Sequence, residues 1–112
     1  MNVRDFAAIA GATALALIAW SHAVAATGEV TVRLFQFKPG TLEVKAGTQV
    51  TWTNQDDIEH TVTSGTPDKR DQRFGDRLPG KGQTITVEFS TSGVYPYFCE
   101  RHQSMRGEIR VN

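Results

Sequence analysis

The sequence predicts an all-β domain, an antiparallel β-sandwich that is preceded by a secretory signal peptide. Apolar and polar residues alternate along short runs, which is the period of a half-buried strand. Turn-forming residues separate these runs roughly every 8–12 residues, and no helical period is found after residue 26. About seven short strands with this spacing are typical of two packed antiparallel sheets.

The first 26 residues differ in composition from the rest of the chain. An apolar stretch rich in alanine and leucine covers residues 7–20, and small residues then offer a cleavage site after Ala25 or Ala26. This layout is typical of a secretory signal peptide, and the apolar stretch is too short to span a bilayer comfortably. We therefore predict a signal peptide at residues 1–26 and one domain at residues 27–112. We expect export to the periplasm, with no stable membrane insertion after cleavage.

In the first predicted strand, Val30, Val32 and Leu34 alternate with polar residues. The alternation then slips by one residue, so that Phe35 and Phe37 are both out of phase with it. A slip of one residue is typical of a β-bulge. We therefore expect a bulge here that turns the strand from one surface to another.

The remaining predicted strands are separated by glycine, proline and charged residues. They cover residues 41–45, 49–54, 60–63, 83–90, 94–99 and 107–112. Pro96 cannot donate to a ladder, so its strand is expected at a sheet edge or with an interrupted ladder. Residues 64–82 mix both charge signs with glycine and proline, and they are predicted to be a long surface connection anchored by Phe74 and Leu78.

The charge of the chain is balanced. It contains 12 basic and 12 acidic residues, which gives a formal net charge of +0 at pH 7. The chain therefore lacks the excess of basic residues that would indicate binding to nucleic acid or to anionic lipid. We therefore expect no nucleic-acid partner.

The most chemically informative segment is residues 99–105, where Cys99, His102 and Met105 follow a C-x-x-H-x-x-M spacing. Thiolate and thioether favour Cu(I), and imidazole suits copper in both common oxidation states. Cys99 ends a predicted strand, and the short loop after it can fold His102 and Met105 back toward the sulfur. A fourth donor is expected from His60, whose place in the alternation puts its side chain inward beside Val62.

The inventory of soft donors is small. The chain has three histidines, two methionines and one cysteine, and His22 and Met1 fall in the predicted signal peptide. The donors that remain are His60, Cys99, His102 and Met105. A single cysteine in an exported protein cannot form an internal disulfide, and ligation protects its thiol. Two imidazoles and a thiolate with a weak axial thioether are the donor set of a blue-copper electron-transfer site.

Other sites explain these residues less well. Attachment of c-type haem needs C-x-x-C-H, and the second cysteine is missing. A structural zinc site normally uses only cysteine and histidine, which leaves Met105 unexplained. A Cys–His hydrolase needs an open cleft, which a sandwich this small rarely offers. If Cys99 were a buried structural cysteine and the histidines were unrelated to it, the closed set of donors would be a coincidence. We therefore expect one copper ion, Cu(I)/Cu(II), and no enzymatic activity.

Two stretches carry a family resemblance. They are Val-Thr-Trp-Thr-Asn at 50–54 with His-Thr-Val at 60–62, and Gly-Val-Tyr-Pro-Tyr-Phe-Cys at 93–99 with His102 and Met-Arg-Gly-Glu-Ile-Arg-Val at 105–111. Together they closely resemble the small cupredoxins, and most of all the amicyanins and plastocyanin-like bacterial proteins. The resemblance covers residues 28–112, and the three-residue step from His102 to Met105 is similar to the short ligand loop of amicyanins.

The resemblance implies a Greek-key, cupredoxin-like sandwich with a mononuclear type 1 copper site. It implies that His60, Cys99 and His102 are equatorial ligands and that Met105 is axial. It also implies that Asn54 lies behind the ligands and ties the two ligand loops together, because such outer hydrogen bonds orient ligands.

Two departures from the resembled family concern residues beside the ligands. Many relatives have proline directly after the second histidine, where this chain has Gln103 followed by Ser104, and proline before the first histidine, where it has Glu59. The docking surface of the family is an apolar patch around the second histidine. Gln103 and Ser104 therefore alter the face that a partner would meet.

The predicted function is that of a periplasmic blue copper protein that carries single electrons. The expected partners are a redox protein donor and acceptor of dehydrogenase, cytochrome or oxidase type, which dock transiently near His102, and the protein is expected to be a monomer. The alternative that the donor set leaves open is a copper carrier or chaperone that delivers the metal to other proteins.

Overall fold

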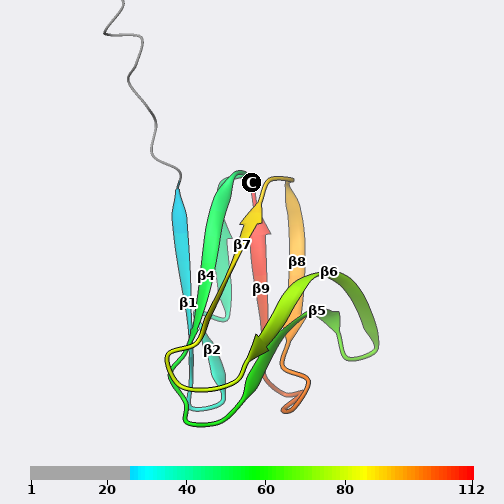
Figure 1. Cartoon of the computed structure of the whole chain (residues 1–112). Coiled ribbons are helices and arrows are strands. Elements are labelled where there is room, and N and C mark those ends of the chain that lie inside the picture. Colours follow the sequence, from blue (N-terminus) through cyan, green and yellow to red (C-terminus); the bar gives the residue numbers. More distant parts are fainter. Residues whose placement is uncertain (1–25) are drawn as a thin grey trace, which may run out of the picture.

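The computed structural model describes residues 26–112 as nine strands in two sheets (Figure 1). One sheet, in the order β2-β1-β4-β7, contains β1 (Thr27–Arg33), β2 (Gln36–Lys38), β4 (Thr48–Asn54) and β7 (Thr84–Phe89). The other, in the order β3-β9-β8-β5-β6, contains β3 (Thr41–Val44), β5 (His60–Thr66), β6 (Lys69–Leu78), β8 (Gly93–Phe98) and β9 (Arg106–Val111). The predicted signal peptide, apart from Ala26, lies outside the described residues. Within residues 26–112, no helix is long and apolar enough to cross a membrane.

The predicted β-sandwich is confirmed, but its two sheets are mixed and not purely antiparallel. β1 runs parallel to β4, from Thr27 opposite Gln49 to Val32 opposite Asn54. β3 runs parallel to β9, and the other pairs are antiparallel. The cause is the path of the chain, which leaves the first sheet after β2, adds β3 to the second sheet and returns as β4 in the same direction as β1.

The core lies between the sheets and is built from the inward residues of the alternating strands. The side chains with the least exposure include Val30, Val32, Val50, Trp52, Val62, Leu78, Tyr97 and Ile109. The Trp52 ring meets the Tyr97 ring edge to face, with 5.3 Å between centroids. Burial of such apolar area contributes roughly 25 cal/mol per Å², so this core provides the rigid base for the loops at its ends.

The expected bulge at Phe35 is wrong, because the chain makes a tight hairpin there. β1 and β2 pair antiparallel, with Arg33 opposite Gln36, so only Leu34 and Phe35 form the turn. Both have positive φ angles, 54° and 58°, which is the geometry of a type I′ turn. Glycine or asparagine usually occupies such positions, since other residues lose about 1–2 kcal/mol each in this conformation.

The expected surface connection at residues 64–82 is also wrong in part, because β6 occupies most of it. β6 is an edge strand that pairs only with β5, and most of its side chains are exposed. The charged outer surface of an edge strand hides the alternation that identifies a strand in sequence, and it discourages pairing with other chains. The two predicted anchors are confirmed, since Leu78 is fully buried and Phe74 packs against the core.

Pro96 lies on a strand with neighbours on both sides, but its ladder to one of them is incomplete. β8 lies between β9 and β5, and it pairs with β5 only at Phe98 and Tyr97. Pro96 pairs with Glu108 of β9, and no residue of β5 pairs with Pro96 on its other side. Of the two arrangements expected for this proline, the interrupted ladder is therefore the one observed.

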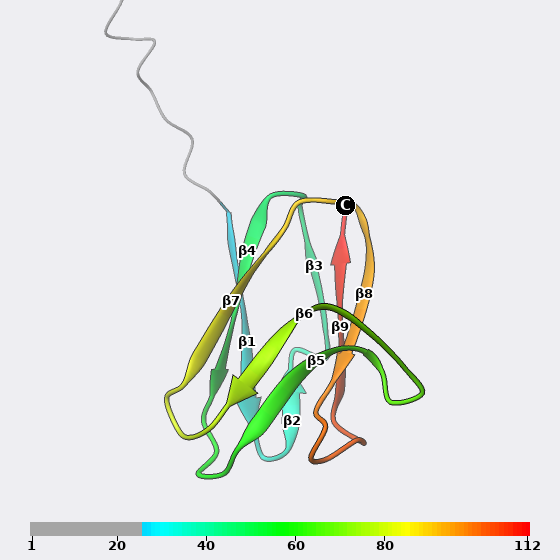
Figure 2. The same cartoon turned by 45° about the vertical axis from the view of Figure 1, so that its right-hand side comes forward.

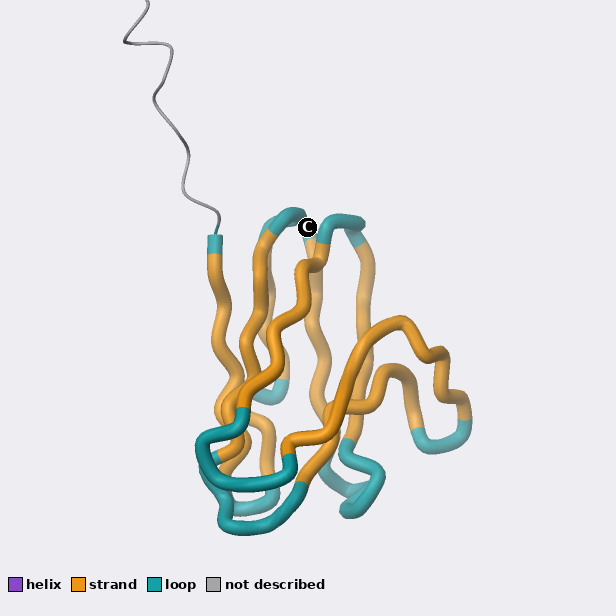
Figure 3. Tube along the Cα trace, viewed as in Figure 1, coloured by secondary structure: helices purple, strands orange, loops and turns teal. Residues whose placement is uncertain are grey.

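Four connections gather at one end of the sandwich. The β1–β2, β4–β5, β6–β7 and β8–β9 loops lie together at the lower end in Figures 1 and 2, and Figure 3 shows them in teal, away from the C-terminus. The β4–β5 connection leads to His60, and the β8–β9 connection contains Cys99, His102 and Met105. The topology thus brings the two segments that carry the predicted donors to the same end.

Candidate metal centre

Three of the four predicted donors meet at this end of the sandwich. The ligating atoms of His60, Cys99 and His102 all lie within 4.8 Å of one another. The Cys99 Sγ atom is 3.7 Å from His60 Nδ1 and 3.9 Å from His102 Nδ1. His60 and Cys99 are fully buried, whereas His102 is partly exposed. The site therefore lies just below the surface, with His102 on its outer side.

These separations fit one metal ion. Nitrogen and sulfur donors bind transition metals at about 2.0–2.1 Å and about 2.3 Å, so two of them in a trigonal arrangement lie roughly 3.7 Å apart. Both observed distances from sulfur to nitrogen are close to this value. Two imidazoles and one thiolate suit copper better than they suit a hard cation, because a hard cation prefers oxygen ligands. The residues present therefore fit a copper ion.

His60 is the first residue of β5, and a hydrogen bond fixes its ring. Its Nε2 atom lies 2.8 Å from Oδ2 of Asp56, whose side chain is mostly buried. A neutral imidazole that donates from Nε2 leaves Nδ1 unprotonated, and Nδ1 is the atom that faces Cys99. Asp56 thus orients His60 so that its free nitrogen faces the other donors.

Asp56 also receives two backbone hydrogen bonds. The Leu34 amide donates to Oδ1 at 2.8 Å, and the Phe35 amide donates to Oδ2 at 3.2 Å. Burial raises the pKa of Asp56, but these amides and the contact with His60 outweigh it, so the pKa lies below its usual value. The carboxylate is therefore ionised at neutral pH and links the β1–β2 turn to His60.

Cys99 directly follows β8, so the core holds its backbone. Its Sγ atom accepts a hydrogen bond from the Thr61 amide at 3.4 Å. The Cys99 amide donates to the carbonyl of Met105 at 3.1 Å, which closes the loop between them. These two contacts hold the sulfur and its loop in place beside the histidines.

Met105 is the buried last residue of the 99–105 loop. Its side chain is 2% exposed, and its amide donates to the carbonyl of His102 at 2.8 Å. Gly107 follows at the start of β9, where a Cβ atom would lie 2.3 Å from the Tyr97 ring. The loop thus returns to the sheet at a residue where a side chain would force the Tyr97 ring or β9 to shift.

Asn54 has a different role from the one that the family resemblance implied. Its Nδ2 atom donates to the carbonyls of Ile58 at 2.8 Å and Leu78 at 3.1 Å, and its Oδ1 atom accepts from the Asp56 amide. These side-chain bonds stabilise the β4–β5 connection and join it to the end of β6. They do not reach the 99–105 loop, because the Asn54 side chain points toward its own loop.

Thr61 makes the direct connection between the two ligand segments. Its amide donates to Cys99 Sγ, and its Oγ1 atom accepts from the Glu100 amide at 2.9 Å. Thr61 was not predicted from the sequence. Its place directly after a predicted ligand was the only available signal, since these contacts join residues that are far apart in the chain.

Ion pairs surround the centre on the surface. Glu59 contacts Arg77 at 2.5 Å and Arg101 at 3.1 Å, so it joins the residue before His60 to the residue before His102. The hydrogen bond from Arg77, together with both positive charges, holds the pKa of Glu59 below its ordinary value. Glu59 thus bridges the two ligand segments at the surface.

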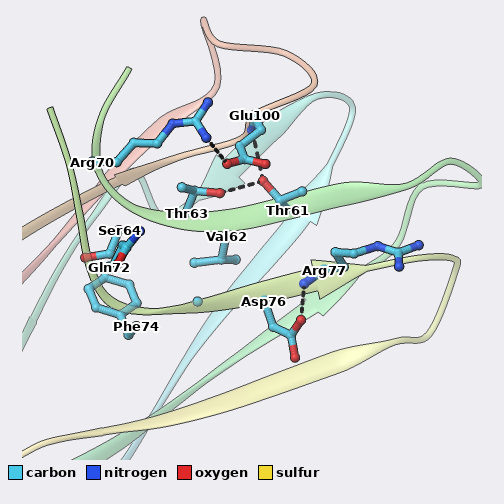
Figure 4. A pocket seen from close by; sticks show the side chains of 11 residues that line it. Thr61, Val62, Thr63, Ser64, Arg70, Gln72, Phe74, Asp76, Arg77 and Glu100 are labelled. Carbon is cyan, nitrogen blue, oxygen red and sulfur yellow. Dashed lines mark hydrogen bonds and ion pairs between the residues drawn. The ribbon is translucent and has the colours of Figure 1, made fainter. Parts of the chain in front are cut away.

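A groove of about 410 Å³, lined by residues of β5 and β6 and by Glu100, lies beside the centre (Figure 4). Figure 4 shows Arg70 paired with Glu100 across it, at 2.6 Å, with Thr61 and Thr63 hydrogen-bonded beneath them. None of the four donors lines this groove. The groove is therefore separate from the metal centre, and Thr61 and Glu100 lie between the two.

Comparisons with known proteins agree with the geometry of the centre. Residues 23–112 match the family of copper-binding proteins described as plastocyanin/azurin. The chain is 36% identical to amicyanin-alpha of Methylorubrum extorquens over 106 residues, which cover 95% of this chain and 89% of that protein. It is 34% identical to plastocyanin of Scenedesmus fuscus, covering 74% of this chain and 99% of that one.

Solved structures give the same result. A novel purple cupredoxin from Nitrosopumilus maritimus superposes with a TM-score of 0.70 at 28% identity, over 76% of this chain and 99% of that one. The reduced state of an amicyanin mutant gives 0.66 at 27% identity, over 84% and 88%. The fold, the donor set and these similarities agree. The chain belongs to the plastocyanin/azurin family of copper-binding proteins as a small cupredoxin, and its cofactor is one copper ion.

Proposed function

We propose that the protein is a periplasmic blue copper protein that carries single electrons between redox partners. His60, Cys99, His102 and Met105 would hold the copper ion. The observation that carries the proposal is the meeting of two imidazole nitrogens and a thiol sulfur within 4.8 Å at the end of a rigid sandwich. This donor set is that of blue-copper electron transfer, in which bound copper supplies a one-electron couple.

The role of the chain is to hold its donors in one arrangement. Asp56 fixes the ring of His60, and the Thr61 amide holds the sulfur of Cys99. Donors that are positioned by the protein need little rearrangement when the charge of the metal changes. With all four donors supplied by the chain, a bound ion would have no position left for a substrate, which favours a carrier over an enzyme.

The partner surface is proposed to lie around His102. Gln103 and Ser104 are exposed and polar, but the same end of the sandwich carries three exposed apolar residues from other loops. Leu34 is 65%, Phe35 is 50% and Ile58 is 41% exposed. Exposed apolar residues that gather at one place favour contact with another protein. Transient docking of a redox donor and acceptor, of dehydrogenase, cytochrome or oxidase type, fits this surface, with the carrier acting as a monomer.

Export is supported by the layout of residues 1–26. Expression of the full chain in a Gram-negative host tests it directly. The protein should be recovered from the periplasmic fraction with an N-terminus at Ala26 or Thr27. Recovery of the uncleaved chain from the cytoplasm would contradict the proposed location and leave the copper site unaffected.

Voltammetry distinguishes electron carriage from copper delivery. The copper-loaded protein should give a reversible one-electron wave and keep its metal through repeated reduction and oxidation. Copper content before and after cycling is measured by elemental analysis of the protein fraction. A protein that delivers copper should instead release or exchange the metal readily on reduction, and that result would overturn the proposal in favour of the carrier or chaperone.

A further inference from the structure

The β1–β2 turn has an unfavourable backbone for its residue types. Leu34 and Phe35 both have positive φ angles, yet neither is glycine, asparagine or aspartate. Both side chains are also largely exposed, so burial of apolar area does not compensate for the conformation. Residues held in such conformations are often found at functional sites, where surrounding contacts impose them. The turn therefore requires a cause outside itself.

That cause is Asp56, and it also contacts a predicted copper ligand. Its carboxylate accepts hydrogen bonds from the amides of Leu34 and Phe35, and one of its oxygens is 2.8 Å from His60 Nε2. The turn and the loop that contains Asp56 are more than 20 residues apart in the chain. A single carboxylate thus fixes the position of the turn relative to His60.

The turn places one aromatic ring against both imidazoles. The Phe35 ring meets His102 nearly at a right angle, with 4.8 Å between centroids, and meets His60 in the same way at 5.5 Å. The two imidazoles are 5.3 Å apart. Edge-to-face contacts at these distances are favourable and depend on orientation. Phe35 therefore restrains both rings, and it matters most for His102, which is partly exposed.

We propose that Phe35 is a positioning residue for the copper centre. Held in place by Asp56 through the β1–β2 turn, its ring keeps His102 in the orientation in which Nδ1 faces Cys99. The proposal rests on one part of the proposed function, namely that the centre binds copper. The restraint on His102 exists in the metal-free protein as well, so it can be tested separately.

Substitutions in the turn test this role, with NMR on the metal-free protein as the first measurement. In Phe35→Ala, the ring signals of His102 should show increased mobility, while the backbone spectrum of the sandwich stays the same. Leu34→Ala is the matched control, because it alters the same turn at a side chain without an aromatic contact to histidine. Phe35→Tyr keeps the ring edge and should restore the wild-type ring signals.

Copper-loaded protein provides the second measurement. Loss of Cu(I) to a strong chelator should be roughly three- to tenfold faster in Phe35→Ala, the change expected when one or two aromatic contacts are lost. The visible absorption band of the Cu(II) form should also shift, whereas Leu34→Ala should match the wild type in both respects. Asp56→Asn should speed copper loss, and adding Phe35→Ala to it should give less than the product of the two single effects, because both act through the same turn.

Two results would overturn the proposal. One is a folded Phe35→Ala variant whose His102 ring signals equal those of the wild type. The other is a rate of copper loss in Phe35→Ala equal to that in Leu34→Ala. If the protein fails to bind copper at all, the proposed function is wrong, and the NMR comparison still decides whether Phe35 positions His102.

Discussion

The two histidines of the metal centre are held in very different ways. His60 is fully buried, and Asp56 binds its ring. Asn54 holds the loop before His60 through two hydrogen bonds and joins it to Leu78 of β6 through a third. His102 is partly exposed on a short loop that is closed by backbone bonds through Met105. Its ring contacts the Phe35 ring nearly at a right angle, with 4.8 Å between centroids.

This difference separates two tasks within one site. The buried half sets the geometry of the centre, because its hydrogen bonds are protected from water and persist without the metal. The exposed half brings a ligand close to the surface, where a partner can approach it. Changes on the His60 side should therefore reduce the stability of the fold, and changes on the His102 side should mainly alter how the metal is held.

The largest expected effect is on the buried side. Asn54→Ala would leave the Ile58 and Leu78 carbonyls and the Asp56 amide without their partner. Each buried polar group without a partner costs about 1–3 kcal/mol, so the free energy of unfolding should fall by about 2–4 kcal/mol. Denaturant unfolding of the metal-free protein measures this change. The exposed neighbour Gln55→Ala is the control, and an equal loss in both variants would contradict the role of Asn54.

A smaller loss is expected where the His102 loop returns to the sheet. In Gly107→Ala, the added Cβ atom would lie 2.3 Å from the Tyr97 ring, so that ring or strand β9 must shift. Overpacking of this kind costs about 1–3 kcal/mol. Gly80→Ala is the matched control, since no atom lies within 4 Å of the added Cβ atom there. Similar melting temperatures for the two variants would show that the loop tolerates a side chain at residue 107.

The smallest effect is expected from the ion pairs that bridge the two halves. Arg77 and Arg101 lower the pKa of Glu59. Their ion pairs with Glu59 therefore stabilise the folded protein above the ordinary pKa of 4.5, and this stabilisation is lost as the pH falls below that value. Glu59→Gln should remove this part of the acid sensitivity. Its effect should also disappear in about 1 M salt, where exposed charges are screened. A pH profile of unfolding identical to that of the wild type would indicate that the bridge contributes nothing measurable.

Much of the fold and of the centre could be predicted from the sequence. Alternation located most of the strands and placed His60 inward, and the small inventory of donors pointed to one cluster. The structure brings His60, Cys99 and His102 together, while their bonds to copper stay a prediction. These features depend on local periodicity and residue type, which the sequence contains directly.

The features that were missed depend on contacts between distant segments. Alternation is the same in parallel and antiparallel strands, so the pairing of β1 with β4 could not be read from it. The Leu34–Phe35 turn contains no glycine or asparagine, and Asp56 stabilises it from 22 residues away. β6 is an exposed edge strand whose charges look like those of a loop. In each case the deciding partner lies elsewhere in the chain.

The visible spectrum of the copper-loaded protein tests the central claim most directly. Oxidised wild-type protein should be intensely blue, because a thiolate bound to Cu(II) absorbs visible light strongly. Cys99→Ala should lose this colour, while Leu34→Ala should keep it. A colourless Cu(II) complex of the wild type, or a Cys99→Ala variant that remains blue, would contradict a type 1 copper centre built from these residues.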